Sequence, residues 1–179
     1  MLKRENTALV LIDIQGKLAE LMHEREALYR NLQILIKGAQ VLKLPILWLE
    51  QYPKGLGPTI PQVAGLLPDQ QPLAKTCFSA CSLDDFQDQL RQSGRRQILL
   101  AGIESHICVY QTARDLLDSA YRVEVVADAV SSRTAENKAL GLERMAQAGA
   151  EITGVEMCLF ELLKQAGTAE FKQIATLVK

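Results

Sequence analysis

The chain is poor in histidine, with only two among its 179 residues, and it has four cysteines. The cysteines show neither the C-x-x-C spacing of redox centres nor the paired spacing of structural zinc sites. A zinc site built from Cys and His ligands is therefore not expected, and we predict that the protein uses no metal and no cofactor. A chain of this length buries a core without disulfides, so we expect the cysteines to be reduced.

Long apolar runs and basic runs are also missing. No apolar stretch approaches the roughly 18 residues that a membrane span requires. The formal net charge is −1, and no cluster of basic residues offers a surface for nucleic acid. Residues 1–6 lack the layout of a signal peptide and lead straight into a strand pattern. We therefore expect a cytoplasmic protein that binds a small-molecule substrate and neither nucleic acid nor a membrane.

The composition is that of an ordinary globular protein, with 48% apolar and 23% charged residues, and it fits one domain over residues 1–179. Continuous apolar runs predict buried strands at residues 7–13, 46–50, 73–75, 97–102, 123–127 and around 152. Helical spacing of apolar residues predicts helices at residues 25–44, 106–119, 135–148, 155–164 and 168–178. This alternation predicts an α/β fold of three layers, in which about six parallel strands lie between two layers of helices.

The sequence also predicts a helix that begins at Ser82 and a long loop at residues 52–72. Ser82 is predicted to open a helix, with Asp85 three residues later in a capping-box-like position. Residues 52–72 hold five of the six prolines and three glycines. We expect a long loop there, and loops of that length in compact domains are usually functional.

Three reactive side chains fall at the carboxyl ends of predicted strands: Asp13, Lys75 and Cys108. Ligands of such sheets bind beyond these ends, where the strand order reverses. Helix-start amides favour a thiolate at Cys108 and an oxyanion formed on the carbon that it attacks. Asp13 is suited to move the thiol proton, and Lys75 to hold Asp13 ionised. The alternative is ordinary structure: Cys108 in the core, Asp13 as a cap and Lys75 on the surface.

Four segments together resemble a known family. They are Leu11-Ile-Asp-Ile-Gln15, Ala74-Lys-Thr76 ahead of Phe78-Ser79, Gly102-Ile-Glu-Ser-His-Ile-Cys108-Val-Tyr-Gln-Thr-Ala113, and Val126-Ala-Asp-Ala-Val-Ser-Ser-Arg133. The chain resembles the isochorismatase-like cysteine hydrolases, a family that includes nicotinamidases and N-carbamoylsarcosine amidohydrolase. The spacing of the segments covers almost the whole chain.

The resemblance implies a catalytic triad of Asp13, Lys75 and Cys108 on a six-stranded parallel sheet. It also implies a non-proline cis peptide between Ile103 and Glu104, which aims the backbone amides of Glu104 and Cys108 into one oxyanion hole. A homo-oligomer is implied as well.

Departures from the family pattern narrow the expected chemistry. Nicotinamidases bind a metal through an Asp-x-His pair after the second strand, where this chain has Glu50-Gln51-Tyr52. Isochorismatases that cleave a vinyl ether do without the cysteine that is present here as Cys108. Residues 50–57 are most similar to the isochorismatase domain-containing branch, which implies no particular substrate.

Further side chains are candidates for the substrate pocket, with ordinary packing as the alternative for each. These candidates are Gln15, Trp48, Gln51, Tyr52, Phe78, His106 and Tyr110. His106 and Cys108 are not expected to form a dyad, because side chains two residues apart on a helix point about 200° apart.

We therefore expect hydrolysis of a carbon–nitrogen bond in a small amide, through a thioester on Cys108 and without a cofactor. The alternatives are hydrolysis of another acyl or ether group, a non-catalytic binding or scaffold protein of the same fold, and a thiol redox protein. The last lacks a clear resolving cysteine.

The missing Asp-x-His pair leads to a first prediction. The purified protein should hold no stoichiometric zinc or iron, and chelators should leave its activity intact. Elemental analysis of the protein before and after dialysis against a chelator measures this. A tightly bound stoichiometric metal would contradict it.

Overall fold

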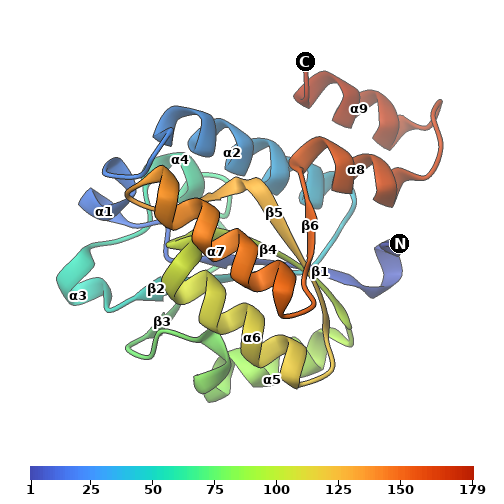
Figure 1. The fold of residues 1–179 in the computed structure, drawn as a ribbon. Helices are drawn as coiled ribbons and strands as arrows, with labels where there is room; N and C mark the ends of the chain where they lie inside the picture. The colour runs from blue at the N-terminus through green and yellow to red at the C-terminus, as the bar shows by residue number, and fades with distance from the viewer.

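Six parallel strands form one sheet in the order β3-β2-β1-β4-β5-β6, in a computed structural model that describes all 179 residues (Figure 1). The strands are β1 (Thr7–Ile12), β2 (Ile46–Gln51), β3 (Leu73–Lys75), β4 (Gln97–Ile103), β5 (Arg122–Ser131) and β6 (Glu151–Thr153). The predicted fold class is confirmed, and each predicted strand lies within two residues of its position except at the carboxyl end of β5.

The strand order reverses between β1 and β4, which pair in register from Thr7 with Gln97 to Ile12 with Gly102. Both strands are buried along their whole length. Side chains of β1 alternate between two separate cores, with Leu9 and Leu11 on one face and Val10 and Ile12 on the other. Burial on both faces explains why these strands show continuous rather than alternating apolarity in the sequence.

Helices form a layer over each face of the sheet. The core on one face includes α1 (Gly16–Glu20), α2 (Arg25–Val41), α4 (Pro61–Ala64), α8 (Val155–Leu163) and α9 (Ala169–Leu177). The core on the other face includes α5 (Asp84–Ser93), α6 (Tyr110–Asp118) and α7 (Ala135–Gln147). Figure 1 shows α2 and α8 on one side of the strands and α5 and α6 on the other. None of these helices is both long and apolar enough to cross a membrane.

Several boundaries differ from the predicted ones for local reasons. Ser82 does not open a helix, because it ends the 3₁₀-helix η2 (Ala80–Ser82), and α5 begins at Asp84 without a side-chain cap. The segment 52–72 is not one continuous loop. It contains α3 (Pro53–Leu56) and α4, each of which has a proline in its first turn, where the missing proline amide costs no hydrogen bond. The helix expected from residue 106 begins as a π-helix, η3 (Ser105–Val109), before α6 continues it.

Gly102 allows β4 to lie against β1 at the point where the strand order reverses. Its φ is +120°, and a Cβ built on it would lie 2.1 Å from the carbonyl oxygen of Ile12. That atom belongs to the backbone of β1, so it cannot rotate away as a side chain would. A side chain at residue 102 would therefore force the carboxyl ends of the two strands apart, immediately before Asp13.

This contact gives a stability prediction with a control inside the chain. Gly102→Ala should lower the free energy of unfolding by roughly 3 kcal/mol or more, because backbone strain and overpacking add. Gly94 also has a positive φ, +67°, but a Cβ there would meet nothing within 4 Å. Gly94→Ala should therefore cost only about 1–2 kcal/mol. Urea unfolding of both variants measures the difference, and equal losses would show that the contact with Ile12 is unimportant.

Candidate active site

Asp13 and Lys75 meet at the carboxyl edge of the sheet, as their positions at strand ends predict. Asp13 follows β1 and has a left-handed backbone with φ +53°, a conformation that Asp tolerates better than most residues. Its backbone amide donates to the carbonyl of Leu49 in β2, at 3.2 Å. Lys75 is the last residue of β3, and its Nζ lies 2.7 Å from Asp13 Oδ2. The alternative of a surface lysine is excluded, because the Lys75 side chain is fully buried.

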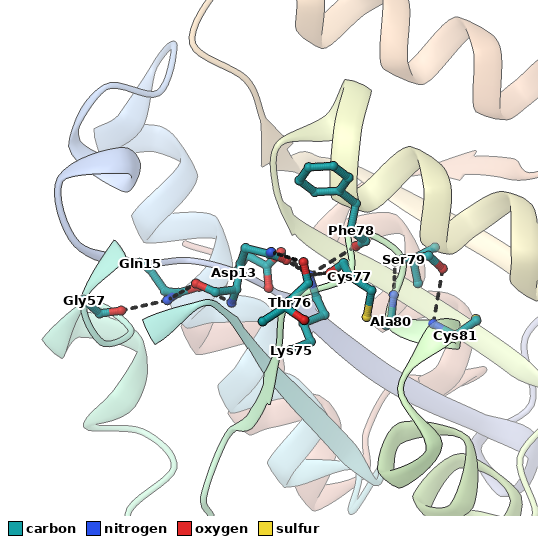
Figure 2. Close-up of polar contacts among 12 residues, drawn as sticks. Asp13, Gln15, Gly57, Lys75, Thr76, Cys77, Phe78, Ser79, Ala80 and Cys81 are labelled. Carbon is teal, nitrogen blue, oxygen red and sulfur yellow. Dashed lines mark hydrogen bonds and ion pairs between the residues drawn. The ribbon is translucent and has the colours of Figure 1, made fainter. Parts of the chain in front are cut away.

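Four oxygen acceptors surround the ammonium of Lys75 (Figure 2). They are Asp13 Oδ2 at 2.7 Å, Gln51 Oε1 at 2.6 Å, Phe78 O at 3.1 Å and Cys77 O at 3.2 Å. An ammonium has three protons to donate, so every one of them has a partner. A buried charge needs such a shell, because it has lost its hydration.

The pKa of the Asp13 carboxyl is raised, although Lys75 lies beside it. Burial raises the pKa of the Asp13 carboxyl, and this effect outweighs the opposing effect of Lys75. Lys75 favours the ionised carboxylate, as predicted, but burial opposes it more strongly. One carboxylate oxygen, Oδ1, is buried and accepts no well-formed hydrogen bond. Asp13 thus offers the neighbouring Cys108 thiol an acceptor of raised proton affinity.

Cys108 lies in η3, beside the Asp13 carboxyl and Lys75, and each of these charges affects its ionisation. The side chain is buried, and burial raises the pKa of the Cys108 thiol to about 12. The negative charge of Asp13 raises it further, while Lys75 opposes both. The expectation of a thiolate stabilised by helix amides is therefore wrong for the free protein. Desolvation dominates, so the thiol stays protonated at neutral pH.

The turn that carries Cys108 has an unusual backbone. The peptide between Ile103 and Glu104 is cis, as the family resemblance predicts. The carbonyl of Glu104 accepts from the amides of Ile107 at 3.0 Å and Val109 at 3.2 Å, whereas the Glu104 amide donates no hydrogen bond within the chain. The Glu104 carboxylate is buried and accepts from the backbone and side chain of Arg133.

Helix α7 supports this turn from behind. A Cβ on Gly141 would lie 2.6 Å from backbone atoms of Ser105, so the two elements are in direct backbone contact. The side chains of Ser105 and Ser132 hydrogen-bond to each other at 2.7 Å. His106 Nδ1 lies 2.9 Å from the same Ser132 hydroxyl. His106 therefore has a partner other than Cys108, in agreement with the prediction that the two do not form a dyad.

Gln15 and Gln51, two of the pocket candidates, bind each other and hold the backbone around the site. Gln15 is fully buried, and its amide nitrogen donates to the carbonyls of Gly57 at 2.7 Å and Gln51 at 3.1 Å. Its oxygen accepts from the Gln51 amide at 2.6 Å. Figure 2 shows Gln15 reaching from the Asp13 turn to Gly57. With its polar groups bound in this way, Gln15 has little left to offer a ligand.

The remaining pocket candidates do not form one group. Trp48 lies in the core between the sheet and α2, the face opposite to that of Cys108, and its Nε1 donates to Thr59 at 2.9 Å. Tyr52 and Phe78 are each 53% exposed. The Phe78 ring points away from the Asp13–Lys75 contact in Figure 2, while its carbonyl accepts from Lys75. Tyr110 shares with His106 a cavity of about 270 Å³ between η3 and α7.

Sequence reasoning missed the roles of Glu50, Thr59, Arg133 and Ser132. The carboxylate of Glu50 is buried and accepts from the backbone amide of Thr59 at 2.6 Å and from its hydroxyl at 2.7 Å. It therefore anchors the segment after β2. The contacts of Arg133 with Glu104 and of Ser132 with Ser105 join residues 29 and 27 positions apart, so no local spacing in the sequence indicates them.

No group of three or more His, Cys, Asp or Glu side chains is arranged to hold a metal.

Comparison with known proteins shows which family the chain belongs to. A family model described as the isochorismatase domain matches residues 7–157. The chain is 36% identical to the secreted isochorismatase effector Isc1 of Phytophthora sojae (strain P6497), over 97% of this chain and 85% of the relative. It is 38% identical to isochorismatase domain-containing protein 2 of Bos taurus, over 97% of this chain and 83% of the relative.

A solved structure is similar along almost the whole chain. The MAR1 ribonuclease of Caenorhabditis elegans superposes with a TM-score of 0.92 at 35% sequence identity. The match covers 99% of this chain and 91% of the other.

The buried thiols predict how stability changes with pH. In the folded protein the pKa values of Cys81, Cys108 and Cys158 are raised from 9.0 to about 12. The unfolded chain therefore releases these protons first, and the free energy of unfolding should fall as the pH rises from 9 to 12. A fully buried thiol contributes a slope of about 1.4 kcal/mol per pH unit in this window.

Cys158→Ala should flatten this alkaline decline, because Cys158 is fully buried. Val155→Ala, a truncation in the same helix, should lower stability without changing the slope. Urea unfolding at several pH values measures both. An unchanged slope in Cys158→Ala would contradict the burial effect.

Proposed function

Since this chain belongs to the isochorismatase family, we propose that it is a hydrolase that cleaves a carbon–nitrogen bond of a small amide through a thioester on Cys108. The observation that carries the proposal is the buried contact of Asp13 with Lys75, 2.7 Å apart, beside the Cys108 thiol. A nucleophile, a proton acceptor and a fixed positive charge are the groups that such acyl transfer requires.

The reaction begins with a neutral thiol. The Asp13 carboxylate, which binds Lys75 through Oδ2, takes the thiol proton as the sulfur attacks the amide carbon. In this proposal the backbone amides of Glu104 and Cys108 donate hydrogen bonds to the developing oxyanion. The Glu104 amide donates no hydrogen bond within the chain. Asp13 then returns the proton to the leaving nitrogen, and ammonia or an amine departs. A water molecule, deprotonated by Asp13, attacks the thioester, and the carboxylic acid and the thiol are released.

The raised proton affinity of Asp13 suits this cycle. A carboxylate with an ordinary pKa is a weak base toward a thiol whose own pKa is about 12. Burial moves the Asp13 pKa upward and so reduces the mismatch. Lys75 stabilises the negative charge that passes among Asp13, the sulfur and the oxyanion.

RNA cleavage is the second candidate, because the Caenorhabditis elegans relative is named a ribonuclease. The site supports a small substrate better. Asp13 and Lys75 are at most 3% exposed and Cys108 is 7% exposed. The net charge of −1 offers little attraction for a phosphate backbone. Hydrolysis of another acyl or ether group, or binding without catalysis, would involve the same residues, and the assay below distinguishes these alternatives.

The oligomeric state of the protein and its location in the cell remain predictions. We propose a homo-oligomer, because large apolar side chains such as Tyr52, Phe78 and Leu140 are more than half exposed. We also retain the predicted cytoplasmic location, although the Phytophthora sojae relative is named a secreted effector.

The proposal is tested by a screen of small amides with ammonia detection, followed by variants on any substrate found. Cys108→Ser should lose nearly all turnover, because an alcohol is far less acidic than a thiol. Asp13→Asn keeps the shape but cannot move a proton, so kcat should fall by roughly 10²–10⁴-fold. Lys75→Ala should also be strongly impaired. Asp13→Asn combined with Cys108→Ser should be scarcely worse than either alone.

Cys81→Ser is the matched control, since Cys81 is another thiol whose pKa is raised to about 12 mainly by burial, and the variant should keep its activity. Near-wild-type turnover in Asp13→Asn with an inactive Cys108→Ser would remove the proton-transfer role of Asp13. Release of RNA fragments from a synthetic oligonucleotide, lost in Cys108→Ser and without ammonia release from any amide, would favour the second candidate.

A further inference from the structure

Gln51 is the closest partner of the catalytic lysine in the proposed site. Its Oε1 lies 2.6 Å from Lys75 Nζ, compared with 2.7 Å for the Asp13 oxygen. Of the four oxygens around this ammonium, only the one from Asp13 carries a charge. The other three come from neutral amide groups. The Lys75 charge is therefore compensated by one carboxylate alone.

The orientation of the Gln51 amide is determined by its other end. Nε2 donates to the carbonyl of Thr76 at 2.8 Å, so Oε1 must be the atom that faces Lys75. A flipped amide would point its NH₂ group at an ammonium and its oxygen at a carbonyl oxygen, and both contacts would be repulsive.

The backbone of Gln51 is held as firmly as its side chain. Its N–H donates to Gln15 Oε1 at 2.6 Å, and its carbonyl accepts from Gln15 Nε2 at 3.1 Å. The next residue, Tyr52, donates its amide to the carbonyl of Lys75 at 2.7 Å. All four polar groups of Gln51 are thus in use, and two of its contacts lead to Lys75 or to the residue that follows it.

We propose that Gln51 is a positioning residue, which holds the Lys75 ammonium against Asp13 while adding no charge that would compete for it. The inference rests on the proposed function of the Asp13–Lys75–Cys108 site. It explains why glutamine suits this position better than glutamate. A carboxylate here would share the lysine charge with Asp13 and would meet the Thr76 carbonyl without a proton to donate.

The test measures the alkylation rate of Cys108 by iodoacetamide between pH 7 and 10, followed by mass spectrometry of its peptide. This readout needs no substrate. Gln51→Glu adds a negative charge beside Lys75, so Cys108 should become harder to ionise and its alkylation should slow roughly tenfold at each pH. Gln51→Met keeps the length but loses the acceptor, and a smaller change of about two- to threefold is expected.

Gln15→Met is the matched control. It breaks the clamp on the same segment but leaves the contact between Gln51 and Lys75 in place. It should lower the urea midpoint without shifting the alkylation profile. A Gln51→Glu profile that coincides with the wild-type profile, with a loss of stability like that of Gln15→Met, would overturn the proposal and leave Gln51 with a structural role only.

Asp13→Asn separates this inference from the proposed function. Removal of the Asp13 charge should speed alkylation of Cys108, because that charge raises the thiol pKa. An unchanged rate in Asp13→Asn would contradict the proposed site itself. A faster rate in Asp13→Asn with no effect of Gln51→Glu would contradict only the role of Gln51.

Discussion

The buried ion pair of Asp13 and Lys75 is the constraint on which the rest of the site depends. Removing two charges from water costs several kcal/mol for each ion, and their attraction offsets this only with good geometry and further hydrogen bonds. The chain meets that condition with a carboxyl-end turn at Asp13, an edge strand that ends at Lys75 and three neutral oxygens aimed at the ammonium. Gln15, which follows β1 and Asp13, binds the carbonyls of Gln51 and Gly57, so the segment that follows β2 belongs to the same arrangement.

The sheet topology explains why these groups meet. With the order β3-β2-β1-β4-β5-β6, the chain after β1 continues into helices on one face of the sheet and the chain after β4 into helices on the other. Asp13 follows β1 and the η3 turn follows β4, so both lie at the edge of the sheet where the strand order reverses. Gly102 permits the close approach of the two strands just before they diverge, and Gly141 lets α7 support the turn that carries Cys108.

Much of this could be predicted from the sequence, because the informative signals are local. Continuous apolar runs predicted the strands, and reactive residues at strand ends predicted the meeting of Asp13 and Lys75. The family resemblance, which the match over residues 7–157 confirms, supplied the cis peptide. What failed depends on distant contacts. Desolvation of Cys108 overrode the helix amides, Trp48 faces the other core, and the anchoring of Thr59 by Glu50 joins residues with no recognisable spacing.

The buried, protonated state of Cys108 has a consequence for the oxidation of this thiol. Peroxide and molecular oxidants attack thiolates at accessible positions, and a neutral thiol within the fold presents neither property. In the proposed reaction the Cys108 thiol passes its proton to Asp13 only as the sulfur attacks the substrate carbon. Cys108, the proposed nucleophile, is therefore expected to stay intact in air without added reductant, where a thiolate at the same position would be oxidised.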